Sequence, residues 1–367
     1  MRVLVTGANG FIGKNLLVHL RENGVESVVF TREMSPSSLT AVLMDVDFVF
    51  HLAGINRPKN ITEFTEGNKE LTEQLSDAIR ASGRQIPVVY TSSIQAEAAN
   101  PYGASKLAAE EALLALERDT KSPVYLYRLA NVFGKWSKPN YNSAVATFCY
   151  NTANNLPIHI NDPEALIRLV YVDDVIKDFM QLLKLRPAGV FRPEVAPEYS
   201  IKVGDLASQL SAFKDSRDSM ISEAVGVGLT RALFATYLSF LRPEQFSYTV
   251  QAHADERGRF VEMLKTKDSG QFSFFTAYPG ITRGGHYHHT KNEKFLVIQG
   301  VARFCFRHIE SGETYEQFTN GQTPEVVQTV PGWSHDITNV GENEMIVMLW
   351  ANEIFDRANP DTITYKV

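Results

Sequence analysis

The stretch Thr6-Gly7-Ala8-Asn9-Gly10-Phe11-Ile12-Gly13 decides the fold of the first part of this chain. It follows an apolar run at residues 3–5 and precedes residues 15–20, whose apolar positions have helical spacing, so it predicts a strand, a glycine turn and a helix. Glycines at positions 7, 10 and 13 allow a tight turn, a close approach of the backbone to a pyrophosphate, and close packing of the helix on the sheet. Taken alone, the same glycines could simply form a turn.

The pattern around this stretch predicts two domains. Apolar runs at 27–30, 48–52, 88–90 and 124–126 alternate with helical stretches such as 70–81 and 105–117, which is typical of a parallel sheet wrapped by helices. From about residue 246, runs rich in Thr, Val and Phe (272–277, 295–298, 345–349) are separated by Gly, Asn and Pro turns. We therefore expect an α/β Rossmann domain at 1–245, a helical hinge near 234–243, and an all-β domain at 246–367.

Composition limits the class of protein. The chain has 367 residues, 44% of them hydrophobic, and a net charge of −6 without a long basic run, which argues against nucleic acid as a partner. Its two cysteines, Cys149 and Cys305, show no spacing typical of a disulfide framework or a thiolate metal site. The absence of a secretory segment or an 18-residue apolar run leads us to expect a cytoplasmic protein without membrane insertion.

The end of the second predicted strand indicates which nicotinamide cofactor is used. NAD-binding folds usually place an acid here to accept both ribose hydroxyls, whereas this strand runs into Thr31 and Arg32. Arg32 can pair with a 2′-phosphate, which favours NADPH. The alternative is that Arg32 is a solvated loop residue and that Glu33 takes the ribose role.

Tyr102 and Lys106 lie four positions apart in a predicted helix, so both side chains can reach one pocket. A tyrosine exchanges protons usefully near neutrality when a neighbouring ammonium lowers its pKa, which is the role expected for Lys106. Ser92 and Ser93, at the end of the preceding strand, could hold a carbonyl oxygen beside the phenol. An isolated Tyr-x-x-x-Lys pair is usually no more than a contact on the surface of a helix. A catalytic role is favoured here because the glycine stretch precedes the pair in the same chain.

Together these motifs resemble the extended short-chain dehydrogenase/reductases that act on nucleotide sugars. The resemblance rests on Thr6 to Gly13, His51-Leu52-Ala53-Gly54, Ser92-Ser93, Tyr102-x-x-x-Lys106, Arg128-x-x-Asn131 with Val132-Phe133-Gly134, and Tyr171 to Asp174. It implies a catalytic set of Ser93, Tyr102 and Lys106, and substrate contacts from Asn131, Asn140 and Arg168. It also implies cofactor contacts from Thr6, Gly7, Asn9, Gly10, Phe11, Ile12, Gly13, Arg32, Leu52, Ala53 and Gly54, besides Tyr102 and Lys106.

One departure from the family pattern narrows the reaction. Relatives that dehydrate sugars carry Asp-Glu just after the catalytic hydroxyl residue, because eliminating water needs an additional acid and base. Here these positions are Ile94 and Gln95, so a dehydratase is disfavoured and hydride transfer at a carbonyl is expected.

A second cluster of chemical groups lies near the other end of the chain. His286 and His288 are two apart and so share one face of a strand, and Glu293 and His335 can complete a set of four ligands. Three imidazoles and one carboxylate suit a divalent ion, most readily zinc, although iron, manganese and nickel fit the same ligand types.

This spacing resembles the cupins, which are jelly-roll barrels, although the proline of Pro331-Gly332-Trp333-Ser334-His335 stands one residue later than usual. Within the cupins, residues 255–260, 283–286 and 294–297 resemble the deoxysugar 3,5-epimerases. That resemblance implies substrate contacts from Arg257 and Arg283 and catalytic roles for His286 and Lys294. His286 is thus assigned both as a ligand and as the base, and a metal-bound imidazole cannot accept a proton.

The two resemblances converge on the two-domain reductases of bacterial capsule and O-antigen synthesis. They imply C3 epimerisation of a UDP-2-acetamido-2,6-dideoxy-4-hexulose in the barrel and then NADPH-dependent reduction at C4, giving UDP-2-acetamido-2,6-dideoxy-L-talose for UDP-N-acetyl-L-fucosamine. The alternative is a single-activity 4-reductase or 4-epimerase whose barrel is a binding or dimerisation module; an oxygen-using cupin is a further alternative. A homodimer is expected.

Overall fold

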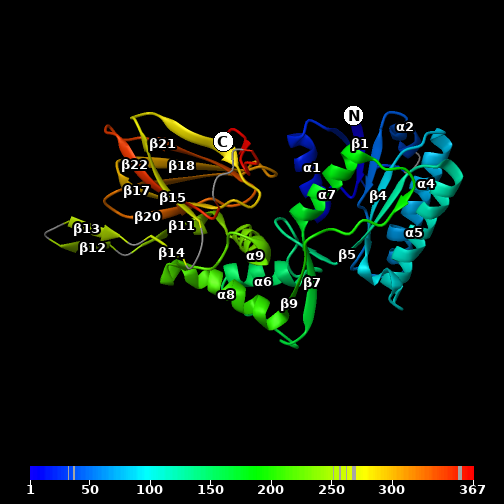
Figure 1. Ribbon diagram of the computed structural model, residues 1–367, viewed down its shortest axis with the longest axis horizontal. Helices are drawn as coiled ribbons and strands as arrows, with labels where there is room; N and C mark the ends of the chain where they lie inside the picture. Colours follow the sequence, from blue (N-terminus) through cyan, green and yellow to red (C-terminus); the bar gives the residue numbers. More distant parts are fainter. Residues whose placement is uncertain are drawn as a thin grey trace. The chain divides into compact units, whose positions relative to one another are not determined.

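Six parallel strands form the central sheet of the N-terminal part in the computed structural model (Figure 1), in the order β2-β1-β3-β4-β5-β8. The strands are β1 (Arg2–Thr6), β2 (Glu26–Phe30), β3 (Phe48–His51), β4 (Val88–Ser93), β5 (Val124–Leu129) and β8 (Val190–Phe191). Because β1 has β2 on one side and β3 on the other, the strand order reverses at β1, and the carboxyl ends of β1 and β3 border the crevice where such folds bind ligands.

Helices cover both faces of this sheet. They are α1 (Phe11–Glu22), α2 (Leu39–Leu43), α3 (Thr62–Phe64), the π-helix η2 (Thr65–Glu70), α4 (Leu71–Ser82), the 3₁₀-helix η3 (Ile94–Glu97), α5 (Pro101–Thr120) and α7 (Val172–Leu185). Helix α4 contacts α2 and α5, and helix α1 contacts α7. Since both faces are covered, inner strands are buried at consecutive positions, as in β4, where every residue is buried.

The structure describes residues 1–31, 33–35, 38–250, 252–255, 258–261, 263–266, 270–353 and 358–367. The chain forms two compact units. The first unit contains Met1–Ser143 and Ile167–Ile201, and the second contains Ala144–Leu166 and Lys202–Val367. A small sheet of β6 (Asn131–Phe133), β7 (Leu166–Tyr171) and β9 (Glu198–Lys202) completes the first unit.

The second unit is built around two antiparallel five-stranded sheets, with orders β11-β20-β17-β22-β15 and β19-β18-β21-β16-β23. Their strands are β11 (Ser247–Thr249), β15 (Gln271–Ala277), β16 (Thr282–Tyr287), β17 (Glu293–Gln299), β18 (Val301–His308), β19 (Thr314–Asn320), β20 (Glu325–Gln328), β21 (Trp333–Asn339), β22 (Met345–Ala351) and β23 (Ile363–Thr364). The rings of Phe295 and Phe304 meet between the sheets with centroids 5.6 Å apart. This is the jelly-roll architecture, so the predicted order of a Rossmann domain followed by a cupin-like domain is confirmed.

Three helices pack together within the second unit: α6 (Ala144–Ala153), α8 (Val203–Ser219) and α9 (Gly228–Leu238). The remaining elements are β10 (Ile221–Ser222) paired with β14 (Lys265–Thr266), the hairpin of β12 (Ala252–Asp255) and β13 (Gly258–Val261), and η4 (Pro243–Gln245). Strand β11 starts next to the boundary expected at 245/246, yet these helices group with the barrel by packing. The expected hinge helix ends at Leu238.

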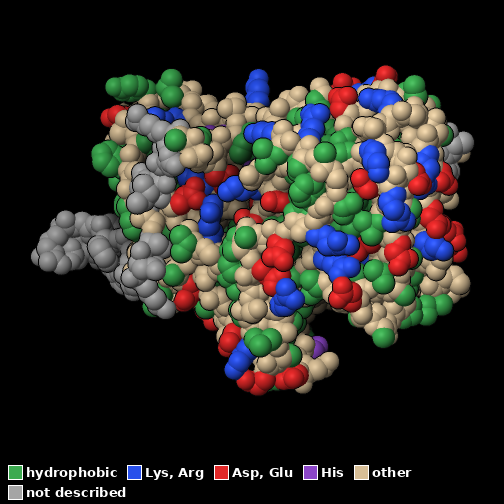
Figure 2. Space-filling view, turned by 45° about the vertical axis from the view of Figure 1, so that its right-hand side comes forward, with side chains coloured by type: hydrophobic (Ala, Val, Ile, Leu, Met, Phe, Trp, Pro, Cys, Tyr) green, Lys and Arg blue, Asp and Glu red, His purple; other side chains and the backbone are tan. Residues whose placement is uncertain are grey.

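On the face shown in Figure 2, charged side chains of both signs are intermixed. Lys and Arg alternate with Asp and Glu over the face shown in Figure 2, which agrees with the small net charge of −6. No helix in the described ranges combines the length and the apolar composition needed to cross a membrane.

Candidate functional site

The glycine loop after β1 lies against the segment that follows β3. Gly7 has a φ of +68°, and a Cβ atom built there would lie 2.6 Å from the backbone nitrogen of Ala53. A Cβ at Gly13 would lie 2.3 Å from the carbonyl oxygen of Gly7. Both positions therefore require glycine for the loop to close against its neighbours.

The loop leads into the N-terminus of α1, which can receive an anion. Gly10 is the N-cap residue, no side chain of the described residues caps this end, and the first turn contains no acid. The backbone N–H groups of a first helical turn have no partner within the helix, and the helix dipole favours negative charge there. The loop can thus hold a dinucleotide diphosphate, as expected from the sequence.

Ser93, Tyr102 and Lys106 lie together beside this loop. Ser93 ends β4, and the other two residues lie on α5. Lys106 is buried, and its Nζ donates a hydrogen bond of 2.9 Å to the carbonyl oxygen of Thr91. A Cβ at Gly54 would lie 3.1 Å from the same Nζ, so the Lys106 ammonium adjoins the segment after β3.

The protonation of this set differs from the expectation. Burial raises the pKa of Tyr102, and a hydrogen bond with Ser93 acts in the opposite direction. Burial also lowers the pKa of Lys106 to about 8, although the nearby carboxylate of Glu110 raises it. The predicted lowering of the Tyr102 pKa by Lys106 is therefore absent from this arrangement, and the phenol stays protonated near neutral pH.

Ser92 and Ser93 have different partners, which the sequence did not distinguish. The Ser92 hydroxyl donates to Oε1 of buried Glu110 at 2.5 Å, and Glu110 also accepts from Arg128 at 2.8 Å. Consecutive strand residues point to opposite faces, so only one of the two serines can face the Tyr102 phenol. Ser93 is that residue.

His51 connects the glycine loop to the helices, a role that the sequence motif did not reveal. The Thr6 hydroxyl accepts from the Ala53 N–H at 3.1 Å and donates to His51 Nδ1 at 2.8 Å. On the other side of the ring, Thr72 uses its own hydroxyl proton to donate to the Asn68 carbonyl. Its oxygen therefore accepts the hydrogen bond of 2.9 Å that His51 Nε2 donates. Burial lowers the pKa of His51 to about 3, so the ring is neutral and fixed in one tautomer.

The substrate residues expected in the first unit, Asn131, Asn140 and Arg168, lie on its surface. The Asn131 side chain donates to the Arg168 carbonyl at 2.9 Å, and Arg168 forms an ion pair with Glu198 at 2.6 Å. Arg57 donates to the Asn140 carbonyl at 3.4 Å. The structure thus brings Asn131 and Arg168 together, whereas Arg32 and Arg257 lie outside the described residues.

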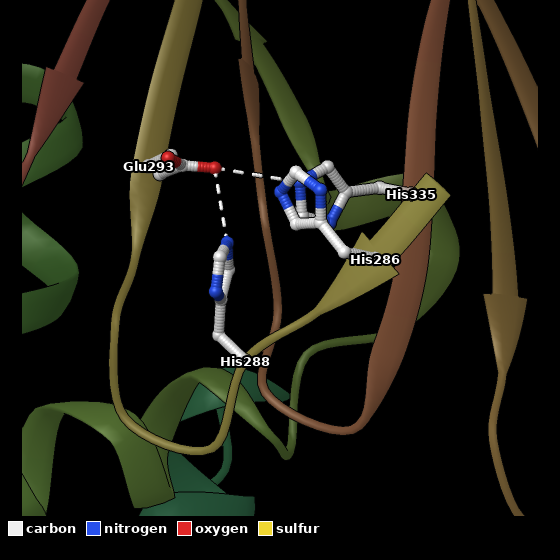
Figure 3. A group of neighbouring side chains, drawn as sticks. All are labelled: His286, His288, Glu293 and His335. Carbon is white, nitrogen blue, oxygen red and sulfur yellow. Dashed lines mark hydrogen bonds and ion pairs between the residues drawn. The ribbon is translucent and has the colours of Figure 1, made fainter. Parts of the chain in front are cut away.

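In the barrel, all four expected ligands meet (Figure 3). Glu293 Oε2 lies 3.1 Å from His288 Nε2 and 3.3 Å from His335 Nε2, and the His286 ring centroid lies 4.8 Å from that of His335. One potential ligand atom from each residue falls within 4.8 Å of every other. His286 and His288 come from β16 and the turn after it, Glu293 from the start of β17, and His335 from β21.

The donor set fits a divalent cation. Burial lowers the pKa of His286 to about 3, with the neighbouring imidazoles acting in the same direction, and burial lowers the pKa of His335. Burial alone would raise the pKa of Glu293, but its interactions with His288 and His335 hold it well below its usual value. Neutral imidazoles around a carboxylate are the protonation states that metal ligands need.

Lys294 and Arg283 do not join this cluster. Lys294 is buried, but it follows Glu293 in β17 and so faces the other side of the sheet, where its Nζ donates to Tyr248 Oη at 2.8 Å. Arg283 donates to the Thr276 carbonyl at 2.7 Å and lies over the Phe275 ring. An ammonium that does contact the cluster is that of Lys291, 2.9 Å from Glu293 Oε1.

Comparison with known proteins gives matches to both parts of the chain. Residues 3–191 match the NAD dependent epimerase/dehydratase family, and residues 253–363 match the polysaccharide biosynthesis C-terminal domain. Over 368 aligned residues the chain is 60% identical to the UDP-2-acetamido-2,6-beta-L-arabino-hexul-4-ose reductase of Pseudomonas aeruginosa strain PA103, covering 100% of this chain and 99% of that one.

One solved structure matches the whole chain, and another matches part of it. The capsular polysaccharide assembling protein CapF from Staphylococcus aureus is 38% identical with a TM-score of 0.69, and the alignment covers 100% of both chains. MoeE5 in complex with UDP-glucose and NAD is 26% identical with a TM-score of 0.53, over 57% of this chain and 81% of that one.

Proposed function

The chain belongs to the NAD dependent epimerase/dehydratase family, and from this premise we propose that it reduces the C4 ketone of a UDP-linked 2-acetamido-2,6-dideoxy-4-hexulose after inverting C3 in its barrel. The single observation that carries the reductase assignment is the grouping of buried Ser93, partly buried Tyr102 and buried Lys106 next to the segment that the glycine loop contacts. The Pseudomonas aeruginosa relative, a hexul-4-ose reductase, supports the substrate class.

The arrangement of the reductase residues suits reduction rather than elimination. A bound nicotinamide supplies the hydride. Tyr102 is held protonated by its raised pKa, so it can give a proton to the C4 oxygen as the hydride arrives. Ser93, hydrogen-bonded to that phenol, can bind the same oxygen. Ile94 and Gln95 offer no carboxylate for removing water.

NADPH is the proposed cofactor because Arg32 follows β2, where an arginine can pair with the 2′-phosphate. The product is proposed to be UDP-2-acetamido-2,6-dideoxy-L-talose, a precursor of UDP-N-acetyl-L-fucosamine for surface polysaccharide. A homodimer and a cytoplasmic location stay predictions.

In the barrel, we assign His286, His288, Glu293 and His335 to one divalent metal, with zinc as the first choice for three nitrogen ligands and one oxygen ligand. A bound cation supplies Lewis-acid polarisation of the sugar carbonyl. His286 acts here as a ligand rather than as the C3 base, because its pKa of about 3 leaves it a poor proton acceptor and its ring lies inside the cluster.

The order of the two reactions follows from chemistry. A ketone at C4 acidifies the hydrogen at C3, and reduction removes that ketone. Epimerisation therefore precedes reduction, and each chain handles the same sugar twice.

The test uses the full chain and two matched substitutions, Tyr102→Phe and Tyr90→Phe. The Tyr90 hydroxyl is buried without a hydrogen-bond partner among the described residues, so removing it should leave both activities unchanged. Tyr102→Phe should abolish NADPH oxidation and leave deuterium exchange at C3 of the keto sugar in heavy water intact.

Two outcomes would overturn the proposal. Normal NADPH oxidation by Tyr102→Phe would remove Tyr102 from the reduction. Absence of C3 exchange in the wild-type chain would leave the barrel as a binding or dimerisation module. The whole chain is used because the barrel forms hydrogen bonds with segments that precede it in sequence and that a shorter protein would lack. For example, the Asn352 side-chain amide donates to the Val225 carbonyl at 3.3 Å.

A further inference from the structure

The geometry points to Asp361 as the positioning residue of the barrel's metal site, acting through a short strap formed by residues 361–365. We propose that this strap holds the three histidine ligands in place and fixes the orientation of the His288 ring. The inference rests on the metal site proposed above. It concerns a segment in which the sequence motifs identify no functional residue.

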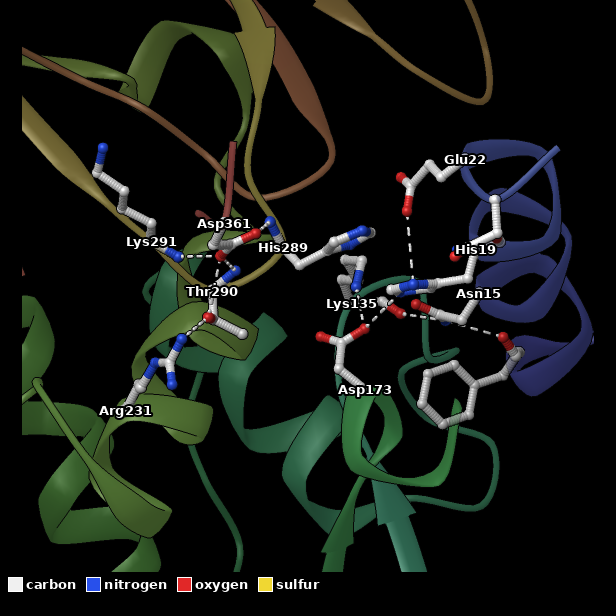
Figure 4. Close-up of polar contacts among 12 residues, drawn as sticks. Asn15, His19, Glu22, Lys135, Asp173, Arg231, His289, Thr290, Lys291 and Asp361 are labelled. Atoms are coloured by element: carbon white, nitrogen blue, oxygen red, sulfur yellow. Dashed lines mark hydrogen bonds and ion pairs between the residues drawn. The ribbon is translucent and has the colours of Figure 1, made fainter. Parts of the chain in front are cut away.

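The Asp361 carboxylate fastens the turn that follows His288 (Figure 4). It accepts hydrogen bonds from the backbone N–H groups of His289 at 2.9 Å, Thr290 at 2.6 Å and Lys291 at 2.7 Å. This turn connects the two ligands His288 and Glu293, so its conformation sets the separation between them. A carboxylate that accepts several backbone N–H groups is among the stronger hydrogen-bonded arrangements in proteins.

The Thr290 hydroxyl adds a fourth contact with a defined direction. Arg231, on α9, donates to Thr290 Oγ1, and a guanidinium can only donate. The Thr290 proton must therefore go to Asp361 Oδ2, 3.1 Å away. Arg231 is itself held by an ion pair of 3.1 Å with Glu353, so the Thr290 hydroxyl is fixed between Arg231 and Asp361.

The backbone of Asp361 acts directly on a ligand. Its carbonyl oxygen accepts a hydrogen bond from His288 Nδ1. Because a carbonyl can only accept, His288 Nδ1 carries a proton, and this hydrogen bond turns Nε2 toward Glu293 Oε2, 3.1 Å away. An outer acceptor that holds the proton on Nδ1 leaves Nε2 as the nitrogen that can bind a cation.

The rest of the strap reaches the remaining histidines. Strand β23 pairs with the edge of β16, with Thr364 opposite His286 and Ile363 opposite Tyr287. The Tyr365 N–H donates to the Gly285 carbonyl at 2.9 Å, and the Tyr365 carbonyl accepts from the hydroxyl of Ser334, next to His335 in sequence, at 2.6 Å. One strap of a few residues thus contacts all three segments that supply histidines.

The experiment measures metal binding by the full-length chain, with Co²⁺ as the probe in competition with a chelator, and records the visible spectrum of the bound ion. Asp361→Ala should weaken Co²⁺ affinity by about 10–100-fold, the usual cost of losing an outer partner of a metal ligand, and should change the spectrum. Asp361→Asn keeps one acceptor oxygen and should give a smaller loss of affinity with the same spectral change.

The matched control is Asn339→Ala, at the far end of β21 from His335. Asn339 is also fully buried and fastens backbone, donating to the carbonyls of Ala277 and Asn343 at 2.9 Å each. Its loss should lower the melting temperature of the barrel but leave Co²⁺ affinity and spectrum at their wild-type values. If Asp361→Ala acted only by destabilising the barrel as a whole, Asn339→Ala would weaken Co²⁺ binding as well.

The outcomes separate this inference from the metal site on which it rests. If the wild-type chain binds no Co²⁺, the metal proposal fails. If the wild-type chain binds Co²⁺ but both Asp361 variants bind it equally well with the same spectrum, or Asn339→Ala weakens binding as much as they do, the positioning role of Asp361 is overturned. Should Asp361→Ala fail to fold by circular dichroism, Asp361→Asn decides by the same criteria.

Discussion

Replacing Gly7 by alanine should lower the free energy of unfolding of the first unit more than a glycine-to-alanine change that only strains the backbone. Two costs arise from the structure. The φ of +68° costs a residue with a Cβ about 1–2 kcal/mol. The new Cβ would also lie 2.6 to 2.8 Å from three backbone atoms of Leu52 and Ala53, and overpacking of this kind costs about 1–3 kcal/mol further.

Gly24 supplies the control for Gly7→Ala. Its φ is +65°, nearly that of Gly7, but no atom lies within 4 Å of a Cβ built there. Gly24→Ala therefore has the conformational cost without the steric one. Both substitutions reduce the entropy of the unfolded chain equally, so this effect cancels in the comparison. The predicted difference between the variants is the steric part alone, about 1–3 kcal/mol.

Thermal unfolding and NADPH titration would measure this difference. For a unit of this size, each kcal/mol corresponds to about 2–4 °C in melting temperature, so Gly7→Ala should melt clearly below Gly24→Ala. Relief of the clash displaces the loop that receives the diphosphate, so NADPH affinity should fall in Gly7→Ala alone. Equal melting temperatures and equal NADPH affinities in the two variants would refute the close approach of Gly7 to the segment after β3.

Four further predictions follow from the sites described. His51→Ala should cost about 1–3 kcal/mol in urea unfolding because the buried Thr6 hydroxyl loses its acceptor and the buried Thr72 hydroxyl loses the donor that His51 supplies; no loss would contradict the described network. The kcat/KM for NADPH should fall above about pH 8, since Lys106 is charged below its pKa of about 8 and neutral above it; a constant value through pH 9.5 would exclude Lys106 from cofactor binding. Chelation of the proposed metal should stop the proposed deuterium exchange at C3 but spare NADPH oxidation with the 3-epimerised sugar; unchanged exchange would mean that this exchange needs no metal. Lys294→Met should leave C3 exchange intact, unlike His286→Ala, because Lys294 bonds to Tyr248 on the outer side of β17; loss of exchange in Lys294→Met would return it to the catalytic set.

Much of the reductase site could be predicted from sequence because its chemistry is local. Gly7 and Gly13 lie within one strand–turn–helix unit, and Tyr102 and Lys106 lie one turn apart on α5. The pKa of Tyr102 could not be predicted in this way. It depends on how deeply the phenol is buried, which is set by elements distant in sequence.

By itself, the sequence determined which elements form, the order of the two folds, and the residues whose spacing along one helix or strand gives them a common face, such as His286 and His288. Only the tertiary structure decided which partners these residues meet. It directs Ser92 to Glu110, Lys294 to Tyr248, and Asp361 to the turn after His288. The physical reason is that periodicity fixes the direction of a side chain relative to its own strand or helix, whereas its hydrogen-bond partners come from segments that only the packing of the whole unit brings together.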